Sequence, residues 1–583
     1  MRALLLLAAG CASSEYTRLY ATADKPADWT WDEIGALERL GPTLVDRGVN
    51  FGVFAANATR VDLLLFDDPE AERPTQQLEM TRYDTVWNLY VEGVGPGQHY
   101  GYVAWGPNWE EDPRFHPGTM HGFRADVDEG GNRYDPNKLL IDPYAKVVHR
   151  DHDWGRGSAA SGPYAEQSTY GAAAKSVVIE STYNWQDDAW IEARQRGEHH
   201  DWNEVVVYEV HVKGFSMAPG SNRHGVEHFG TFRGLGEGAA YLQDLGITAV
   251  ELLPIHEKPA DGGYWGYNNL SWFAPETTYS AAWHDGGGAL TGSYDRYAAA
   301  GKKPYHVVNF VTAHDGFTLF DLFSYPQKEN GCGPLNPICC VDACSAWCDP
   351  TSGESNNHSR DWAEGGDESL KRQMMRNAFV GLLLSNGTPM MLGGDEWMRT
   401  QYGNNNAYTT GSDNEWAWFR WSEWTSENRN NVFRHRMHDF VRDLLTLRRE
   451  HASAFSPREW GSGMPITWLD EHGGPASGAT WGSRHMQVFW DDAGGEPRIA
   501  MLINMEQGPT TFRIPGGVDW GVVVDTQAYY DRPGRSGEPT GWFDENPDAD
   551  PFQSRNITLD DPTPVSGVYT VEPRSIVVLR ETP

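Results

Sequence analysis

Three carboxylates stand directly after apolar segments, where they could act on a substrate. Asp315 follows the segment Val307–Val311, with His314 beside it, and Asp395 and Glu396 follow a second apolar segment. Both segments predict buried parallel strands, and the carboxyl ends of such strands carry the chemistry of α/β barrels. Carboxylates in that position can serve as nucleophile or as general acid and base. The alternative is a structural strand whose end is capped by polar side chains.

The elements that would position these residues alternate between strand and helix. The run Val205–Val212 predicts a buried strand. A helical stripe follows it, formed by Leu235, Ala239, Leu242 and Leu245. Ala249–Leu253 then predicts another buried strand. Because strand, helix, strand is the repeating unit of a parallel barrel, the sequence predicts a (β/α) barrel at residues 204–460.

Two further blocks show the two-residue alternation of antiparallel strands. In residues 40–145 apolar side chains recur at every second position, for example at Val49, Phe51 and Val53. Residues 461–583 contain similar short runs. We therefore expect a multidomain chain. Its predicted order is a targeting segment at 1–25, a β-sandwich at 40–145, a linker at 146–203, the barrel at 204–460 and a C-terminal antiparallel β-sandwich at 461–583.

Several motifs resemble the α-amylase superfamily, glycoside hydrolase family 13, as it occurs in isoamylases and bacterial glycogen-debranching enzymes. The stretch Asn309–Leu319 is similar to the last of the four signature segments of that family. Further similarity lies in Tyr264–Tyr267, Thr388–Glu396 and Gly403–Tyr408. Residues 40–145 resemble the N-terminal glucan-binding module of isoamylases, ending in Asp142–Ala145.

The resemblance implies a glycosidase that hydrolyses α-1,6 branch links in glycogen or starch with retention of configuration. It implies that Asp315 stabilises the transition state by binding sugar hydroxyls, with His314 beside it. Tyr267 is implied to stack beneath the sugar at the cleavage subsite, with Trp265 nearby. The implied partner is an α-glucan such as glycogen or amylopectin. No cofactor is implied as necessary, and the sequence leaves calcium open.

The middle of the expected barrel is too short. Only residues 254–306, 53 in all, separate Leu253 from Val307, where the family places four strands with their helices. The nucleophile of the family, an Asp on the fourth strand, and its general acid, a Glu after the fifth, belong to segments that we do not find. We therefore expect an incomplete barrel with impaired activity, in which Ala249–Leu253 and Val307–Val311 lack their usual neighbours. Asp395 and Glu396 are poor replacements, since they belong to the eighth strand.

Three hypotheses follow for the whole chain. It is a debranching enzyme that has lost part of its barrel, a non-catalytic α-glucan-binding lipoprotein, or a damaged reading frame that does not fold properly. The 25 Trp and 25 Tyr residues suit contact with sugar rings, although aromatic-rich β cores explain them equally well. The net charge of −34 argues against nucleic acid, because phosphates would be repelled.

The amino terminus predicts export. Arg2 precedes the apolar run Ala3–Gly10, and Ala8–Cys11 resembles the lipid-attachment box of bacterial lipoproteins. The alternatives are a short ordinary signal peptide or a misplaced start. No other segment reaches the roughly 18 apolar residues of a membrane helix. We expect a protein that is anchored at the cell envelope if Cys11 is acylated, and secreted otherwise.

Cysteines are concentrated in one loop. They are Cys332, Cys339, Cys340, Cys344 and Cys348. In an oxidising compartment five such residues most simply form two local disulfides and leave one thiol. A zinc site is the alternative, disfavoured because no Cys-x-x-Cys pair is present. The pairing cannot be deduced from the sequence.

Overall fold

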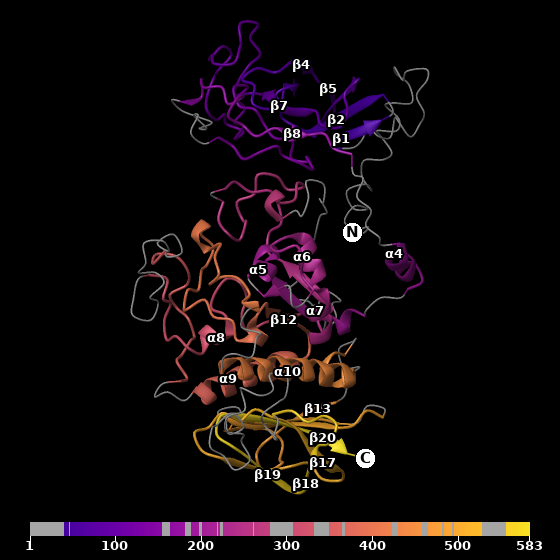
Figure 1. Cartoon of the computed structure of the whole chain (residues 1–583), viewed down its shortest axis with the longest axis vertical. Helices are drawn as coiled ribbons and strands as arrows, with labels where there is room; N and C mark the ends of the chain where they lie inside the picture. Colours follow the sequence, from indigo (N-terminus) through magenta and orange to yellow (C-terminus); the bar gives the residue numbers. More distant parts are fainter. Residues whose placement is uncertain are drawn as a thin grey trace. The chain divides into compact units, whose positions relative to one another are not determined.

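The computed structural model describes most of the 583-residue chain (Figure 1). The described residues are 40–45, 47–153, 164–180, 188–197, 201–218, 220–221, 225–260, 262–279, 307–331, 349–363, 368–421, 429–457, 465–477, 479–480, 483–491, 495–527 and 556–582. They form two compact units, each taken by itself below.

The first unit is built on a β-sandwich, as the alternating residues predict. One sheet has the order β1-β2-β6-β5 and the other the order β4-β3-β7-β8. The strands are β1 (Gly41–Val45), β2 (Gly48–Phe54), β3 (Arg60–Phe66), β4 (Gln76–Glu79), β5 (Thr81–Tyr83), β6 (Val86–Glu92), β7 (His99–Trp105) and β8 (Ser176–Val177). Val49, Phe51 and Val53 point from β2 into the core between the sheets. β3 is buried on both faces, since Leu64 and Phe66 pack into a second cluster.

Two segments extend this unit beyond the predicted boundary. Part of the predicted linker 146–203 belongs to the sandwich, because β8 pairs antiparallel with β7. The loop after residue 254 also belongs to the first unit, although the sequence places it in the barrel; it includes the 3-10 helix η4 (Thr277–Tyr279). Phe273 of this loop stacks on Tyr144 at 5.6 Å between ring centroids. Its attachment therefore depends on aromatic packing as well as on backbone bonds.

The second unit contains a parallel sheet of four strands among its described residues. The order is β10-β9-β12-β11. The strands are β9 (Val207–Val210), β10 (Ala249–Leu252), β11 (Val308–Asn309) and β12 (Thr388–Leu392). All three neighbouring pairs are parallel. As expected for an incomplete barrel, β10 and β11 are the two ends of this sheet.

Helices follow the strands in the α/β pattern. Those of this region are α4 (Asp188–Gln195), η2 (Trp202–Glu204), α5 (Val212–Ser216), α6 (Phe232–Glu237), α7 (Ala239–Leu245), α8 (Leu319–Leu322), α9 (Glu368–Leu383), η9 (Asp395–Trp397), η10 (Thr410–Ser412), α10 (Arg429–Glu450) and α11 (Ala452–Phe455). The single helix expected around Leu235–Leu245 is divided into α6 and α7 at Gly238, which caps both. Gly246 then ends α7 with a φ of 100°, a left-handed conformation that favours glycine.

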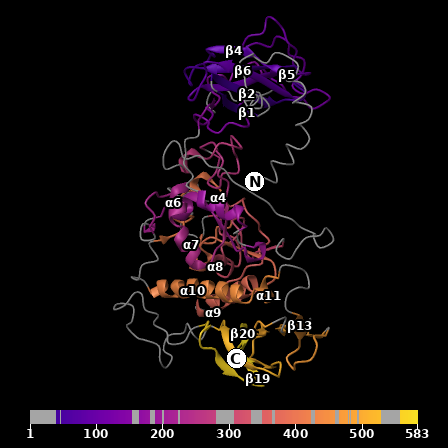
Figure 2. The ribbon, with the colours of Figure 1, turned by 90° about the vertical axis from the view of Figure 1, so that its right-hand side faces the viewer.

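A second antiparallel sandwich closes the chain. Its larger sheet has the order β13-β14-β15-β20-β17-β18, and β16 pairs with β19. The strands are β13 (Ile466–Leu469), β14 (His485–Trp490), β15 (Ile499–Asn504), β16 (Thr510–Arg513), β17 (Asp519–Asp525), β18 (Thr563–Val565), β19 (Val568–Val571) and β20 (Ser575–Thr582). Figures 1 and 2 show α9 and α10 between this sandwich and the parallel sheet. Gln373 of α9 donates to the carbonyls of Pro573 and Arg574, which ties the helix to β20.

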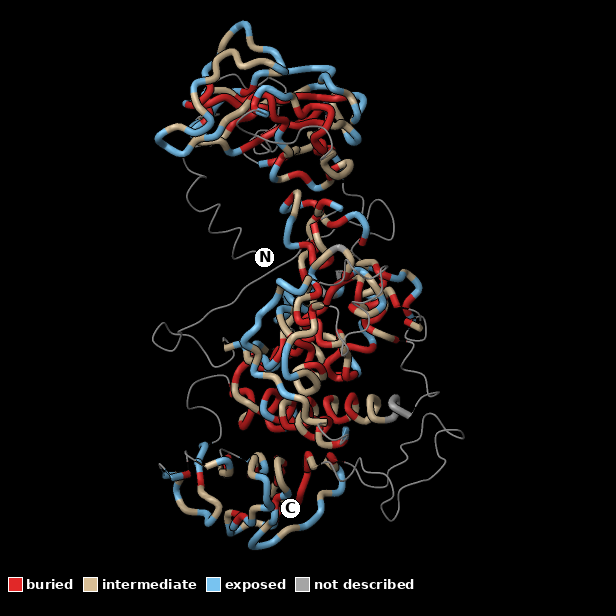
Figure 3. Tube along the Cα trace, turned by 90° about the vertical axis from the view of Figure 1, so that its left-hand side faces the viewer, coloured by how far each residue is buried: buried red, intermediate tan, exposed pale blue. Residues whose placement is uncertain are grey.

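Burial follows these layers. Figure 3 shows buried residues inside the β-sandwiches and along the helices above the C-terminal sheet. The largest core joins Tyr208 of β9 with Phe379 of α9 and Phe440 of α10, so the parallel sheet is well covered on that face. No helix among the residues described is long and apolar enough to cross a membrane.

Candidate functional site

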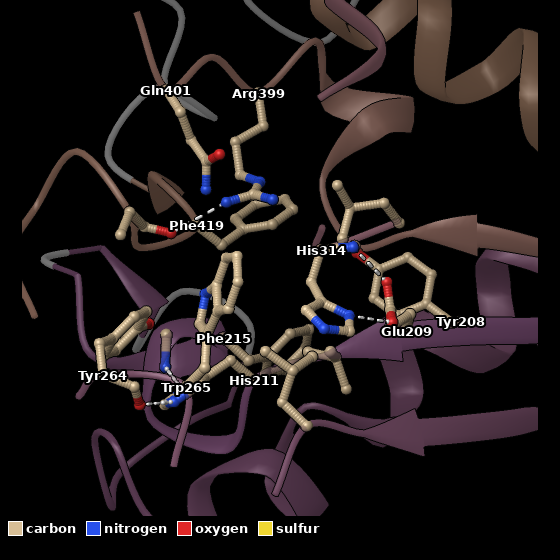
Figure 4. Close-up of a pocket in the computed structure, with 16 residues that line it drawn as sticks. Tyr208, Glu209, His211, Phe215, Tyr264, Trp265, His314, Arg399, Gln401 and Phe419 are labelled. Atoms are coloured by element: carbon tan, nitrogen blue, oxygen red, sulfur yellow. Dashed lines mark hydrogen bonds and ion pairs between the residues drawn. The ribbon is translucent and has the colours of Figure 1, made fainter. Parts of the chain in front are cut away.

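An open pocket of about 480 Å³ lies at the carboxyl ends of β9 and β12. Sixteen residues of the second unit line it (Figure 4). They are Tyr208, Glu209, Val210, His211, Gly214, Phe215, Leu253, Tyr264, Trp265, His314, Leu392, Gly393, Arg399, Gln401, Ala417 and Phe419. The position at strand ends is the one that parallel α/β folds use for ligands.

Glu209 and His314 form the charged centre of the pocket. Oε2 of Glu209 accepts the backbone N–H of His314 at 2.7 Å, and Oε1 lies 2.6 Å from Nδ1 of the imidazole. Burial by itself lowers the pKa of His314, but the hydrogen bond and the negative charge of Glu209 outweigh it and raise this pKa above its usual value. The pair therefore favours an imidazolium that faces a carboxylate.

Aromatic rings form the wall opposite this pair. Trp265 packs edge-on against His314 at 5.0 Å between centroids and an interplanar angle of 89°. Tyr264 stacks on His211 at 4.0 Å. Nδ1 of His211 accepts the Gly214 N–H at 3.1 Å, so Nε2 carries the proton and donates to the Tyr264 carbonyl at 2.9 Å. With both nitrogens engaged, His211 is held as a neutral structural group.

Arg399 and Gln401 supply the remaining polar groups. Nη1 of Arg399 donates to the carbonyl of Ala417 at 3.0 Å. With the Gln401 amide oriented so that its nitrogen donates to the Asn404 carbonyl, its oxygen accepts from the same Nη1 at 3.2 Å. The pocket thus combines apolar rings with a guanidinium, an amide and an ion pair, a lining that suits a neutral ligand rich in hydroxyl groups.

The structure brings together only some of the predicted site residues. His314 and Trp265 line the pocket and touch each other. Asp315 is not among the lining residues; its side chain is 77% exposed, with Oδ2 at 3.8 Å from Nε2 of His314. Tyr267 belongs to the first unit and is 58% exposed. Its predicted stacking beneath a sugar remains a prediction.

Asp395 and Glu396 do not reach the pocket. Asp395 accepts hydrogen bonds from the Thr312 hydroxyl at 2.5 Å and from the Leu319 N–H at 2.8 Å. Burial raises its pKa to about 7. Oε1 of Glu396 accepts from the hydroxyls of two tyrosines in the core. Both carboxyls are fully buried structural groups, so the proximity to the pocket inferred from their sequence position was wrong for the side chains.

Metal and cysteine predictions find little to test them. No group of three or more His, Cys, Asp or Glu that could hold a metal ion occurs among the described residues. Cys11 and the five loop cysteines, Cys332, Cys339, Cys340, Cys344 and Cys348, lie outside the described part of the chain. The lipid attachment, the disulfides and the zinc alternative therefore stay predictions from the sequence.

Glu209 is the functional residue that the sequence analysis missed. It interrupts the apolar run Val205–Val212, and a charge inside a predicted buried strand is itself a signal, because buried charges are usually paired. Its partner His314 is 105 residues away. Only the fold shows which group provides the pairing.

Comparison with known proteins gives a consistent family. Residues 39–145 match carbohydrate-binding module 48, the isoamylase N-terminal domain. An isoamylase from Flavobacterium sp. is 23% identical over 83% of this chain and 89% of its own length. A glycogen debranching enzyme from Salmonella typhi is 26% identical over 84% of this chain and 96% of its own.

The chain belongs to the isoamylase and glycogen-debranching family. Among solved structures, pullulanase from Bacillus acidopullulyticus shares the fold, with a TM-score of 0.56 and 16% identity over 93% of this chain and 75% of that one. The match with the family isoamylase extends over 723 aligned positions, more than the 583 residues of this chain. That family member therefore has segments without a counterpart here.

Proposed function

We propose that this chain binds α-glucans of the glycogen or amylopectin type and that, by itself, it hydrolyses their α-1,6 links poorly or not at all. The observation that carries this proposal is the composition of the pocket. Glu209 is the single carboxylate among the described residues that line it, and that carboxylate is paired with His314.

The affinity for glucans is supported by the family and by the lining. The matched N-terminal module is described as carbohydrate-binding, and relatives are named isoamylase and glycogen debranching enzyme. A group B streptococcal pullulanase of similar fold was solved with maltotetraose. Aromatic rings such as Trp265 offer flat apolar faces, while Arg399 and Gln401 offer polar groups. Such binding needs no cofactor.

We assign the polar contacts to the residues at the end of β11. His314 presents its imidazole to the pocket, and the exposed carboxylate of Asp315 stands beside it. Together they would donate to and accept from sugar hydroxyls. Tyr267 is the candidate for stacking on a sugar ring, because more than half of its surface is free.

The proposed weakness in hydrolysis follows from the number of carboxylates. Retaining glycosidases need two carboxyl groups about 5 to 5.5 Å apart, one as nucleophile and one as acid and base. Asp395 and Glu396 are buried in the core with their oxygens occupied. General acid–base catalysis alone is worth roughly 10² to 10⁴ in rate. A pocket without the second carboxylate should lose at least that much.

Electrophoresis of the full chain in gels containing glycogen tests the binding, and release of reducing sugar from amylopectin tests the turnover. We expect retarded migration without enzyme-dependent sugar release. Unchanged mobility at every glycogen concentration would overturn the glucan-binding proposal. Steady debranching that survives further purification would overturn the proposed impairment and return the chain to the active members of its family.

A pair of matched variants tests the pocket itself. Asp315→Asn should weaken the binding of maltotetraose measured by calorimetry, because it removes a charged hydrogen-bond acceptor beside His314. Asp519→Asn makes the same chemical change at the exposed start of β17 and should leave the affinity unchanged. Equal affinities for the two variants would show that the sugar binds elsewhere.

A further inference from the structure

The parallel sheet of the second unit is open at both ends. β10 pairs only with β9, and β11 pairs only with β12, among the residues described. Apolar side chains are left partly free there: Val250 of β10 is 42% exposed and Val308 of β11 is 40% exposed. Strand edges of this kind present unpaired backbone groups and recruit other strands.

The same chain is too short to fill the gap. Between the end of the described loop at Tyr279 and the resumption at residue 307 lie residues 280–306. That length falls below the roughly 30 residues of a single βαβ unit. Closure at eight strands, the number at which side chains fill a barrel, needs four more parallel strands. They must come from another source.

The two edges of this sheet are complementary to each other. In a parallel sheet the two terminal edges expose opposite sides of the strand, so β11 of one chain can pair in parallel with β10 of another. The two edges cannot meet within one sheet, since β9 and β12 separate them by three strand spacings, about 14 Å. A twofold axis parallel to the strands repeats the same joint on the other side.

We propose that two copies of this chain join through these edges into one closed barrel of eight parallel strands. Each copy contributes the order β10-β9-β12-β11, and the two joints, β11 to β10 of the partner, are equivalent by symmetry. Closure satisfies both edges of both copies at once. The pocket at the carboxyl ends of β9 and β12 then faces the strands of the partner, so the barrel interior is complete only in the dimer.

The registers identify side chains that would meet at the joint. Glu251 is aligned with Glu209, which is aligned with Leu392. Val308 is aligned with Thr388, four residues before Leu392 on β12. Because side chains alternate along a strand, Glu251 and Val308 lie on the same face of the sheet. Across the joint, Glu251 of one copy is therefore a neighbour of Val308 of the other.

Charge opposes this assembly at low ionic strength. Each chain carries a net charge of −34, and like-charged molecules repel over distances greater than 10 Å when salt is dilute. The dimer should therefore strengthen as salt is added. An assembly held by surface ion pairs would show the opposite trend.

Sedimentation equilibrium of the full chain over about a hundredfold range of concentration tests the proposal by mass action. We expect the mass to rise from 65.2 kDa to twice that value and no further. A monomer at all concentrations and salt levels would overturn the proposal, as would continued growth to larger species, which would mean that the edges pair without closing.

A charge cycle at Glu251 and Val308 tests the joint. Val308→Lys places a cation near Glu251 of the partner and should retain the dimer, whereas Val308→Glu places two anions together and should weaken it about tenfold or more. Adding Glu251→Lys should reverse both effects, so that Glu251→Lys with Val308→Glu dimerises and Glu251→Lys with Val308→Lys does not.

Two of the four variants carry like charges and two carry opposite charges, so a general folding defect cannot imitate the pattern. Thermal unfolding of each variant reports whether it is folded. Equal dimerisation of Val308→Lys and Val308→Glu, with no reversal by Glu251→Lys, would place the contact elsewhere and overturn the proposal. Val568→Lys, on an exposed position of β19, is the control that should leave the dimer intact.

Discussion

Glu209 contacts His314 through both carboxylate oxygens, one to the backbone N–H at 2.7 Å and one to Nδ1 at 2.6 Å. The contact joins the central strand β9 to the turn after β11. It therefore fixes both the position of the His-Asp turn and the protonation of its imidazole. A single buried carboxylate sets the geometry and the charge of the pocket.

The first prediction concerns this charge. Glu209→Gln keeps a side-chain oxygen near Nδ1 but removes the negative charge, so the pKa of His314 should fall. Titration of the imidazole signals by NMR measures the change. Glu251→Gln is the graded control, because Glu251 also raises this pKa but is the last and smallest of the causes. An equal fall in both variants would show that general electrostatics, rather than the direct contact, sets the value.

The same pair should contribute to stability in a defined pH range. Because the pKa of His314 is raised in the folded state, the contribution is fully present below the unfolded pKa of about 6.5. It is lost as pH rises through the folded pKa. Chemical unfolding at several pH values should show this decline for the native chain and a smaller one for Glu209→Gln. The same decline in both would contradict the assignment.

Long apolar runs predicted their strands well, and short ones did not. Ala249–Leu253 and the run before Gly393 became β10 and β12 almost unchanged. Val307–Val311 forms a strand only at Val308–Asn309. That segment lies at the end of the sheet and has one neighbour, with two aligned pairs. A strand therefore ends where its pairing ends, and an apolar sequence cannot reveal how many residues its neighbour offers.

The site was harder to predict because its contacts join distant segments. Trp265 and His314 were recognised separately, yet their packing depends on the turn after β11 meeting the loop after β10. Tyr267, two residues after Trp265, falls into the other compact unit. Adjacency in sequence thus said little about common membership in a pocket.

The second prediction concerns the buried carboxylate of Glu396. Oε1 accepts from the hydroxyl of Tyr208 at 2.9 Å and of Tyr241 at 2.6 Å. Tyr241→Phe removes one donor from a carboxylate that water cannot reach, which should cost about 1 to 3 kcal/mol of unfolding free energy. Tyr408→Phe is the matched control, since Tyr408 is 40% exposed, and should be nearly neutral. Equal stabilities would mean that water or another group replaces the lost donor.

The third prediction concerns the amino terminus. If Ala8–Cys11 is a lipid-attachment box, expression in a bacterial host with labelled palmitate should give a labelled product in the membrane fraction. Cys11→Ser should abolish the label, because the sulfur is the acylated atom, while Cys340→Ser should keep it. Label retained in Cys11→Ser, or absent from the native chain, would contradict lipid anchoring.

The last prediction concerns two buried glutamates of the first unit. Glu257 accepts the N–H of Thr277 at 2.9 Å, and Glu276 accepts the hydroxyl of Thr278 at 2.6 Å. Burial, and then the charge of Glu276, raises the pKa of Glu257 to about 7. The folded carboxyl keeps its proton to about pH 7, whereas the unfolded one loses it near 4.5.

Because the folded state binds this proton more tightly, the unfolding free energy should fall as pH rises between these two values. Glu257→Gln cannot ionise and should remove this dependence, so that above pH 7 the variant gains on the order of 1 to 3 kcal/mol relative to the native chain. Glu129→Gln, a surface change in the same unit, should follow the native profile. Melting temperatures from pH 5 to 8 measure the difference, and parallel curves for the native chain and Glu257→Gln would show that Glu257 ionises freely in the fold.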